Sequence, residues 1–470
     1  MRKTKIICTI GPASDDKKIL EQMCQAGMNV ARLNFSHGTH PEHLEKIKKI
    51  KAVRKKLGLP IAILLDTKGP EYRIRTFKNG SITLQDGDDF TFTTTQVEGD
   101  ERRVSVSYEN LHNELHPGDR ILVDNGLLIF EVVSVAGNDI HCKTIAGGVM
   151  RDRKSMSFPN KVLNSVYLSE QDKSDLLFGI AQDVDFIACS FVSRAQDLRD
   201  VKAFLNANGG SDISLIAKIE NRSGVDHIEE ICEECDGIMI GRGDMGVEIP
   251  FEQLPGIQKQ LITKCRLLGK RVITATEMLE SMIEKPRPTR AEISDVANAV
   301  YDGSSAVMLS GETAAGKYPV ETIVAMDKIC EEAERGINYT SRFRRTPFQI
   351  KNTVDAISHA TCGMAIDIDA RVIVACSLSG ATARMISRFR PPVDIIGLTV
   401  SEKTYRQLAL SWGVIPVMSE VFQSIDVLFY TGAKVAASAL GLQKGEHIVI
   451  TGGRTNGVSG NTNLIKVETI

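Results

Sequence analysis

The fold follows from residues 213–249, which read ISLIAKIENRSGVDHIEEICEECDGIMIGRGDMGVEI. This stretch contains two short apolar runs, SLIAKI and GIMI, and each is too short for a helix and typical of a strand buried on both faces. Charge begins where each run stops, at Lys218 and Glu220 after the first and at Asp244 after the second. If the two strands are parallel neighbours, an ammonium group and two carboxylates meet at the same strand ends.

These three side chains suit a metal-dependent site for an anionic substrate. Glu220 and Asp244 offer hard oxygen ligands of the kind that magnesium or manganese prefers. Lys218 can neutralise negative charge that develops during a reaction. The sequence therefore predicts a divalent-metal site beside a cationic group.

The same pattern of a short apolar run followed by polar residues occurs eight times, with helical segments between the runs. The alternation predicts an α/β fold, and eight units favour a closed (β/α)₈ TIM barrel with its polar residues at the carboxyl rim. An open doubly wound sheet is the alternative. The predicted strands are residues 5–10, 29–34, 61–65, 185–189, 214–219, 237–240, 271–274 and 306–309.

Two further domains interrupt or follow the barrel. Residues 71–167 alternate with period two and are broken by DG, PGD and NG turns, which predicts a small antiparallel β-barrel domain inserted as a lid. The barrel then comprises residues 1–70 and 168–340. Residues 341–470 predict a C-terminal α/β regulatory domain, and its first residues, SRFRRTPFQIKN, are interpreted as a linker.

Composition excludes several classes of function. A length of 470 residues predicts two to four domains. The net charge of −2 argues against binding of nucleic acid or a membrane surface through bulk charge. No apolar run approaches the roughly 18 residues that span a bilayer. The apolar run after the basic residues of MRKTKIICTIGP is only a strand long, so it is not interpreted as a signal peptide.

The ten cysteines are scattered, and several lie inside apolar runs. This distribution is typical of reduced thiols in the core of a cytoplasmic protein. Cys232 and Cys235 form a CxxC, but it is isolated in an acidic helical stretch. A packing role is therefore favoured over a zinc or redox site.

The predicted rim is rich in cations and suits a phosphate or carboxylate-phosphate substrate. A lone rim arginine is more often a structural salt bridge, but here the polar residues all fall just after strands. There is no GxxxxGK[ST] loop, and GRGDMG lacks the spacing of a dinucleotide-binding loop. The rim comprises Arg32, Asn34, Ser36, Asp66, Thr67, Arg73, Lys218, Glu220, Arg242, Asp244 and Thr276.

Seven motifs in order carry a family resemblance along nearly the whole chain. They are RLNFSHG (32–38), LDTKGPE (65–71), KIEN (218–221), GRGDMGVEIP (241–250), ITATEMLESM (273–282), KPRPTRAE (285–292) and MLSGETAAGKYP (308–319). With these motifs the chain closely resembles the pyruvate kinases of the bacterial type.

The resemblance implies a phosphotransferase that moves the phosphoryl group of phosphoenolpyruvate to ADP, in the last step of glycolysis, and that assembles as a homotetramer. The implied catalytic residues are Lys218, Thr276 and Arg32, and substrate contacts add Gly243 and Asp244. The implied metal ligands are Glu220 and Asp244 for magnesium and Asn34, Ser36, Asp66 and Thr67 for potassium, with Glu71 matching potassium-dependent members. The implied nucleotide contacts are Asn34, His37, Arg73 and Lys154.

A loop in the third domain resembles the effector loop of allosteric pyruvate kinases. It follows a predicted strand and opens a helix, where backbone N–H groups and hydroxyls can bind a phosphate of a sugar phosphate or AMP. Hydroxyl-rich loops also serve as simple helix caps, and that alternative stays open. The candidate effector residues are Ser377, Ser379, Gly380, Ala381, Thr382 and Arg384, with Arg388 and residues 452–461 nearby.

Two other functions compete with this one. A metal-dependent TIM-barrel lyase acting on pyruvate or phosphoenolpyruvate would share Lys218, Glu220 and Asp244 but would need no ADP. A catalytically silent phosphosugar-binding protein would be expected to have lost that rim. ADP-dependent formation of pyruvate distinguishes the first alternative.

Overall fold

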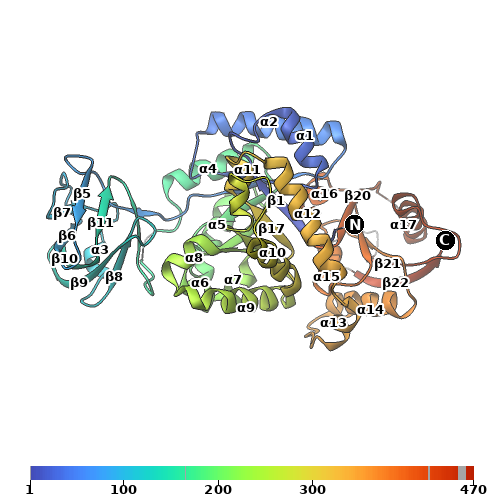
Figure 1. The fold of residues 1–470 in the computed structure, drawn as a ribbon. Helices are drawn as coiled ribbons and strands as arrows, with labels where there is room; N and C mark the ends of the chain where they lie inside the picture. The colour runs from blue at the N-terminus through green and yellow to red at the C-terminus, as the bar shows by residue number, and fades with distance from the viewer. Residues whose placement is uncertain (1, 165, 422–423, 454–461) are drawn as a thin grey trace.

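The computed structural model describes residues 2–164, 166–421, 424–453 and 462–470. Its three lobes lie in a row, with the helix-covered barrel between a β domain and a C-terminal α/β domain (Figure 1). The inserted β domain leaves the barrel after the third strand and returns before the fourth. It therefore lies next to the carboxyl rim.

Eight parallel strands close into a barrel, which confirms the TIM-barrel prediction and excludes the open sheet. β1 pairs with both β2 and β17, so the sheet has no edge. Nearly every strand residue is buried, as expected where helices cover the outside and side chains fill the inside. The strands are β1 (Lys5–Thr9), β2 (Val30–Asn34), β3 (Ala62–Asp66), β13 (Phe186–Cys189), β14 (Ser214–Ile219), β15 (Gly237–Gly241), β16 (Arg271–Ala275) and β17 (Ala306–Leu309).

Helices surround the barrel, and several begin at side chains that cap their free N–H groups. Thr289 and Glu292 form a capping box at the start of α10, and Asp16 accepts from two N–H groups at the start of α1. The helical elements are α1 (Lys17–Gln25), α2 (His40–Leu57), α4 (Glu170–Ala181), α5 (Ala195–Ala207), α6 (Arg222–Asp226), α7 (Ile228–Glu234), α8 (Arg242–Glu248), η1 (Phe251–Gln253), α9 (Leu254–Leu267), η2 (Glu280–Ile283), α10 (Arg290–Asp302), α11 (Gly311–Ala314) and α12 (Pro319–Arg335).

The inserted domain is a seven-stranded sheet with a separate two-stranded sheet. It differs from the predicted antiparallel barrel in one pairing, because β6 and β7 run parallel. Phe90, Phe92 and Phe130 pack edge-on in its core. Its elements are β4 (Tyr72–Arg73), β5 (Ser81–Leu84), β6 (Asp89–Thr93), β7 (Arg103–Ser105), α3 (Leu111–Glu114), β8 (Arg120–Val123), β9 (Leu128–Ala136), β10 (Asp139–Ala146), β11 (Gly148–Arg151) and β12 (Ser155–Ser157).

The C-terminal domain has its own five-stranded sheet in the order β20-β19-β18-β21-β22. The predicted linker is wrong in its first part, because a helix covers Tyr339–Arg345, with Asn338 as its cap and Phe343 buried. The elements are α13 (Tyr339–Arg345), α14 (Thr353–Asp367), β18 (Val372–Cys376), α15 (Ala381–Arg388), β19 (Asp394–Thr399), α16 (Glu402–Leu408), β20 (Val414–Met418), α17 (Ile425–Leu440), β21 (His447–Gly453) and β22 (Thr462–Thr469). In the part of the chain that the structure describes, no helix is long and apolar enough to span a bilayer.

Ion pairs and hydrogen bonds join the C-terminal domain to the amino ends of the barrel strands. Arg406 Nε lies 2.6 Å from Asp185 Oδ1, just before β13. Lys5 Nζ, at the start of β1, donates to the carbonyl oxygen of Val414 at 2.8 Å. The carboxyl ends of the strands face away from this junction and toward the inserted domain.

The buried Lys5 makes stability depend on pH. Burial, helped by Arg2, lowers the pKa of Lys5 to about 7. The unfolded chain therefore holds more protons than the folded chain above pH 7, and stability rises from there toward the ordinary lysine pKa of 10.5. For Lys5→Met we expect this contribution, at most ~1.4 kcal/mol per pH unit, to disappear. Thermal unfolding of both proteins at pH 7, 8 and 9 measures it, and parallel pH profiles would contradict the assignment.

Candidate active site at the barrel mouth

Lys218 stands between two carboxylates at the mouth of the barrel. Its Nζ lies 3.0 Å from Glu220 Oε1 and 3.1 Å from Asp66 Oδ1. Lys218 and Glu220 come from the end of β14, and Asp66 is the last residue of β3. β13 separates the two strands, so the closed barrel brings together residues that are 152 positions apart.

A hydrogen-bond network extends from this group to the neighbouring strands. Arg32 Nε donates to Asp66 Oδ2 at 2.6 Å, and Arg32 Nη1 donates to Thr9 Oγ1 at 2.8 Å. Ser190 Oγ accepts from Lys218 Nζ at 2.6 Å and approaches Asp66 Oδ1 at 3.3 Å. Sequence reasoning did not include Ser190 in the site, although its place directly after a predicted strand was the available signal.

The network keeps its charges paired inside the protein. Burial alone would lower the pKa of Lys218, but the carboxylates of Asp66 and Glu220 outweigh it and raise that pKa above the ordinary value. Burial likewise opposes ionisation of Asp66, yet Lys218 and Arg32 hold the pKa of Asp66 below its usual range. Lys218 is therefore a cation, and Asp66 an anion, at neutral pH.

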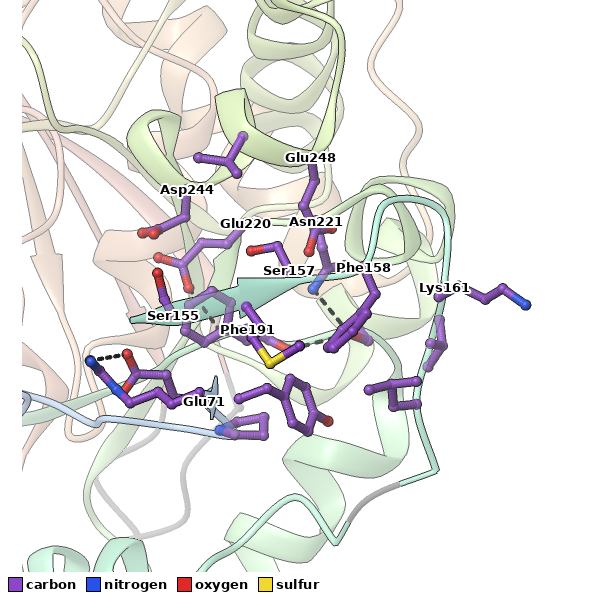
Figure 2. A pocket seen from close by; sticks show the side chains of 18 of the residues that line it. Glu71, Ser155, Ser157, Phe158, Lys161, Phe191, Glu220, Asn221, Asp244 and Glu248 are labelled. Carbon is purple, nitrogen blue, oxygen red and sulfur yellow. Dashed lines mark hydrogen bonds and ion pairs between the residues drawn. The ribbon is translucent and has the colours of Figure 1, made fainter. Parts of the chain in front are cut away.

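Glu220 and Asp244 line one pocket of about 330 Å³, and Figure 2 shows their carboxyl groups turned toward the same space. Glu220 Oε2 accepts from the N–H of Phe191 at 2.8 Å, whereas no partner is recorded for the exposed carboxylate of Asp244 among the described residues. Burial raises the pKa of Glu220 to about 7 against the pull of Lys218, and Asp244 adds to the rise. A divalent cation would stabilise both groups in their charged form, so this donor set fits magnesium or manganese.

Thr276 lies in a strained turn directly after β16. Thr276 has a φ of 68° and Glu277 a φ of 53°. Residues other than glycine rarely adopt this left-handed backbone conformation. Thr276 Oγ1 accepts from the N–H of Gly243 at 2.9 Å, which joins this turn to the start of α8.

Arg242 holds the turn in place. Its guanidinium donates from Nε to Thr276 O at 3.0 Å and from Nη2 to Glu277 O at 2.9 Å. Its Nη1 pairs with Asp295 Oδ2 at 2.7 Å. The rim arginine of the sequence analysis is thus a structural residue in this structure, and its effect on chemistry passes through Thr276.

We expect Arg242→Lys to lower kcat about tenfold or more, because an ammonium group cannot make these forked bonds and small misplacements at a reacting centre are costly. Magnesium affinity should change little, since Arg242 contacts neither Glu220 nor Asp244 directly. Arg199→Lys, at an exposed ion pair with Glu234, is the matched control. Unchanged kcat in purified Arg242→Lys would contradict the positioning role.

The inserted domain contributes the other wall of the pocket. Arg73 and Lys154 line it together with Glu71. Lys154 Nζ pairs with Asp124 Oδ1 at 2.9 Å, and Arg73 pairs with Glu71 and donates to Arg153 O at 2.6 Å. Both basic side chains predicted to contact the nucleotide therefore face the same pocket as Glu220.

The residues predicted to bind potassium lie at the ends of β2 and β3. Asn34 and Asp66 are paired positions of these strands, and Asn34 Oδ1 accepts from the N–H of Ser36 at 3.1 Å. Thr67 Oγ1 accepts from the N–H of Ser190 at 3.2 Å. His37 is exposed in the following turn, and its carbonyl oxygen accepts from His43 Nε2 at 2.9 Å.

The predicted effector loop connects β18 to α15, far from the mouth. Gly380 has a φ of 72° and precedes the first helical residue, Ala381, while Arg384 Nη1 donates to Ser379 O at 3.0 Å. Thr382 Oγ1 forms a hydrogen bond with Thr462 Oγ1, and Ser377 N–H donates to Leu398 O at 2.9 Å. Arg388 instead pairs with Asp355. Of the neighbouring loop, residues 454–461 lie outside the described residues.

The closed barrel and its charged mouth define a TIM-barrel enzyme. The family profile for the pyruvate kinase barrel domain matches residues 1–323, and that for the pyruvate kinase alpha/beta domain matches residues 355–468. The chain belongs to the pyruvate kinase family, whose reaction transfers the phosphoryl group of phosphoenolpyruvate to ADP.

Individual relatives agree over the whole length. The chain is 45% identical to the pyruvate kinase of Clostridium acetobutylicum, with all of both chains covered. It is 46% identical to the pyruvate kinase of Staphylococcus saprophyticus, covering all of this chain and 81% of that protein. A crystal structure of a pyruvate kinase from Cryptosporidium parvum superposes with a TM-score of 0.95 at 36% identity and covers 100% of this chain and 96% of the other. These relatives do not favour the lyase alternative.

Proposed function

We propose that the barrel mouth transfers the phosphoryl group of phosphoenolpyruvate to ADP and releases pyruvate, as a step of glycolysis. The observation that carries the proposal is the contact of one ammonium group with two carboxylates, Lys218 with Glu220 and Asp66, beside the pocket that Asp244 also lines. Phosphoryl transfer requires positioning and charge neutralisation more than covalent chemistry. This arrangement supplies both.

Each residue has a distinct role in the proposal. Lys218 neutralises the charge of the phosphoryl group in transit and of the enolate left behind. Arg32, oriented by Asp66 and Thr9, faces the same charge. Thr276, held by Arg242, lies near the proton delivered to the enolate, and Gly243, whose N–H donates to Thr276 Oγ1, contacts the substrate beside it.

The cofactors are part of the proposal. Glu220 and Asp244 would hold magnesium or manganese, which when bound offsets the charge of substrate oxygens. Asn34, Ser36, Asp66 and Thr67 would hold potassium, because they offer side-chain oxygen atoms at the adjacent ends of β2 and β3. Arg73, Lys154, His37 and Asn34 would contact ADP, because Arg73 and Lys154 line the lid wall of the pocket and can exchange their carboxylate partners for phosphate oxygens. The cytoplasmic location that the sequence predicts stays part of this proposal.

The test is pyruvate formation coupled to lactate dehydrogenase, run with and without ADP, magnesium and potassium. We expect turnover only with ADP and a divalent metal, and a large gain with potassium. Pyruvate formation that does not need ADP would support the lyase alternative instead.

Assembly and regulation belong to the same proposal. A homotetramer is expected, and its mass in solution tests it. Ser377, Ser379, Gly380, Ala381, Thr382 and Arg384 would bind the phosphate of a sugar phosphate or AMP, because the loop presents hydroxyls and N–H groups before a helix. Kinetic titration with fructose 1,6-bisphosphate, ribose 5-phosphate and AMP tests this site, and no response to any of them would retire it.

A further inference from the structure

Three arginines are buried between the barrel and the C-terminal domain without an acidic partner. Arg266, Arg271 and Arg390 are at most 6% exposed, and none of them forms an ion pair within the described residues. Two other buried arginines of the C-terminal domain do have acidic partners, because Arg388 pairs with Asp355 and Arg406 with Asp185. Buried guanidinium groups are normally paired, because an uncompensated charge costs several kcal/mol.

Among the described residues, all three arginines leave polar atoms without hydrogen bonds, and for Arg266 these are Nε and Nη1. Arg271 Nη1 and Arg390 Nε have no partner, although both side chains are more than nine-tenths buried. The remaining contacts of Arg271 are weak, with Ser411 Oγ and Gln407 O each at 3.3 Å. Arg390 is better held, by Gly303 O at 3.0 Å and other oxygens. The free N–H groups mark donors that no protein atom uses.

Arg271 and Arg390 line a single small pocket at the junction. Its wall is formed by five basic side chains and three serines, with no carboxylate: Lys270, Arg271, Arg384, Arg388, Arg390, Ser305, Ser387 and Ser411, together with Gly269 and Trp412. The barrel supplies residues on β16 and before β17, and the C-terminal domain supplies α15 and the residues before β20. The cavity measures about 10 Å³, which is room for one particle of the size of water.

Charge repulsion is part of this site. Burial, and then the nearby Arg384, lower the pKa of Arg271 to about 9, while Asp236 offsets a smaller part. Burial and Arg266 lower the pKa of Arg390 well below its ordinary value.

The rings of Phe186 and Trp412 face the guanidinium groups of Arg271 and Arg390 and offset part of the charge. A water molecule would satisfy the free N–H groups, and an anion would in addition offset the remaining charge.

We propose that this pocket binds one small inorganic anion, of the size of chloride, between the barrel and the C-terminal domain. The free donor of Arg271, the serine hydroxyls and the absence of a lining carboxylate define its chemistry, and the small volume favours a monatomic anion over phosphate. The anion links the two domains, since both contribute cations to it. It lies at the amino end of β16, the strand whose other end is followed by Thr276.

The first experiment locates the ion in crystals of the full chain soaked in sodium bromide, whose anomalous signal identifies it. We expect a peak within hydrogen-bonding distance of Arg271 Nη1. If the bromide crystals show no anomalous peak in this pocket, the proposal is overturned. Density for a tetrahedral oxyanion in crystals soaked in phosphate, with no halide peak in the bromide crystals, overturns the size argument.

The second experiment measures thermal unfolding in chloride and in gluconate at equal ionic strength, with the active site saturated by magnesium and oxalate. We expect chloride to raise the Tm of the wild type by about 2–4 °C. The shift should vanish in Arg271→Gln and remain in Arg371→Gln, an exposed arginine paired with Glu446. Equal shifts in all three proteins would overturn the proposal.

A third variant keeps the test decisive if Arg271→Gln does not fold. Ser411→Asp places a carboxylate beside Arg271 Nε, in the position of a built-in anion. We expect a higher Tm in gluconate than that of the wild type and no further gain in chloride. A Ser411→Asp protein that still gains the full chloride shift contradicts a site at this pocket.

Discussion

Replacing Lys218 by methionine is expected to lower turnover by about three orders of magnitude or more while ADP binding survives. Lys218 is the cation that contacts both Asp66 and Glu220 at the mouth, and its raised pKa keeps it charged throughout the working range. Methionine fills a similar volume but supplies no charge to the phosphoryl group or the enolate. The coupled assay measures kcat, and calorimetric titration measures ADP affinity.

The variant must be shown to fold, because it leaves Asp66 and Glu220 buried without their shared partner. Arg32 still compensates Asp66, and bound magnesium would compensate Glu220, so we expect a folded protein in magnesium buffer. Lys51→Met is the matched control, since Lys51 donates to a backbone carbonyl on the outside of the barrel. Near-normal turnover of purified Lys218→Met would refute the role assigned to Lys218.

The barrel could be predicted from sequence because its strands are uninterrupted apolar runs with polar residues only at one end. The predicted strand at 214–219 coincides with β14, and 306–309 with β17. Buried parallel strands are uninterrupted apolar runs because both of their faces are covered. The rim residues could be predicted by the same rule, because the carboxyl ends of all strands in a closed parallel barrel lie at one rim.

Features that depend on distant contacts could not be predicted in this way. Arg242 stands after a strand like the other rim residues, but Asp295 and the carbonyls of a strained turn determine its role. The helix α13 was not predicted, because most of its residues are basic or polar. Only two buried residues, Tyr339 and Phe343, give an apolar pattern, which is too short to recognise in the sequence. The junction arginines carry no local signal, because nothing near Arg271 in sequence shows that its partners are absent.

Asp244→Asn is expected to weaken magnesium binding by at least tenfold to a hundredfold and to lower turnover by about two to three orders of magnitude. Asp244 is exposed on α8, so its removal should cost little stability. The amide keeps the shape of the side chain but removes the negative charge beside Glu220. Activity as a function of free magnesium, and manganese binding followed by electron paramagnetic resonance, measure the two effects separately.

Glu248→Gln is the matched control for this prediction. Glu248 lies one turn further along α8 and lines the same pocket. Burial, and then Asp244 and Glu220, raise the pKa of Glu248 to about 8, so its carboxyl group is already mostly protonated at neutral pH. Glutamine resembles that neutral form, and we expect magnesium affinity within about twofold of the wild type. Equal losses in the two variants would mean that the pocket responds to total charge, and the assignment of Asp244 as a ligand would fail.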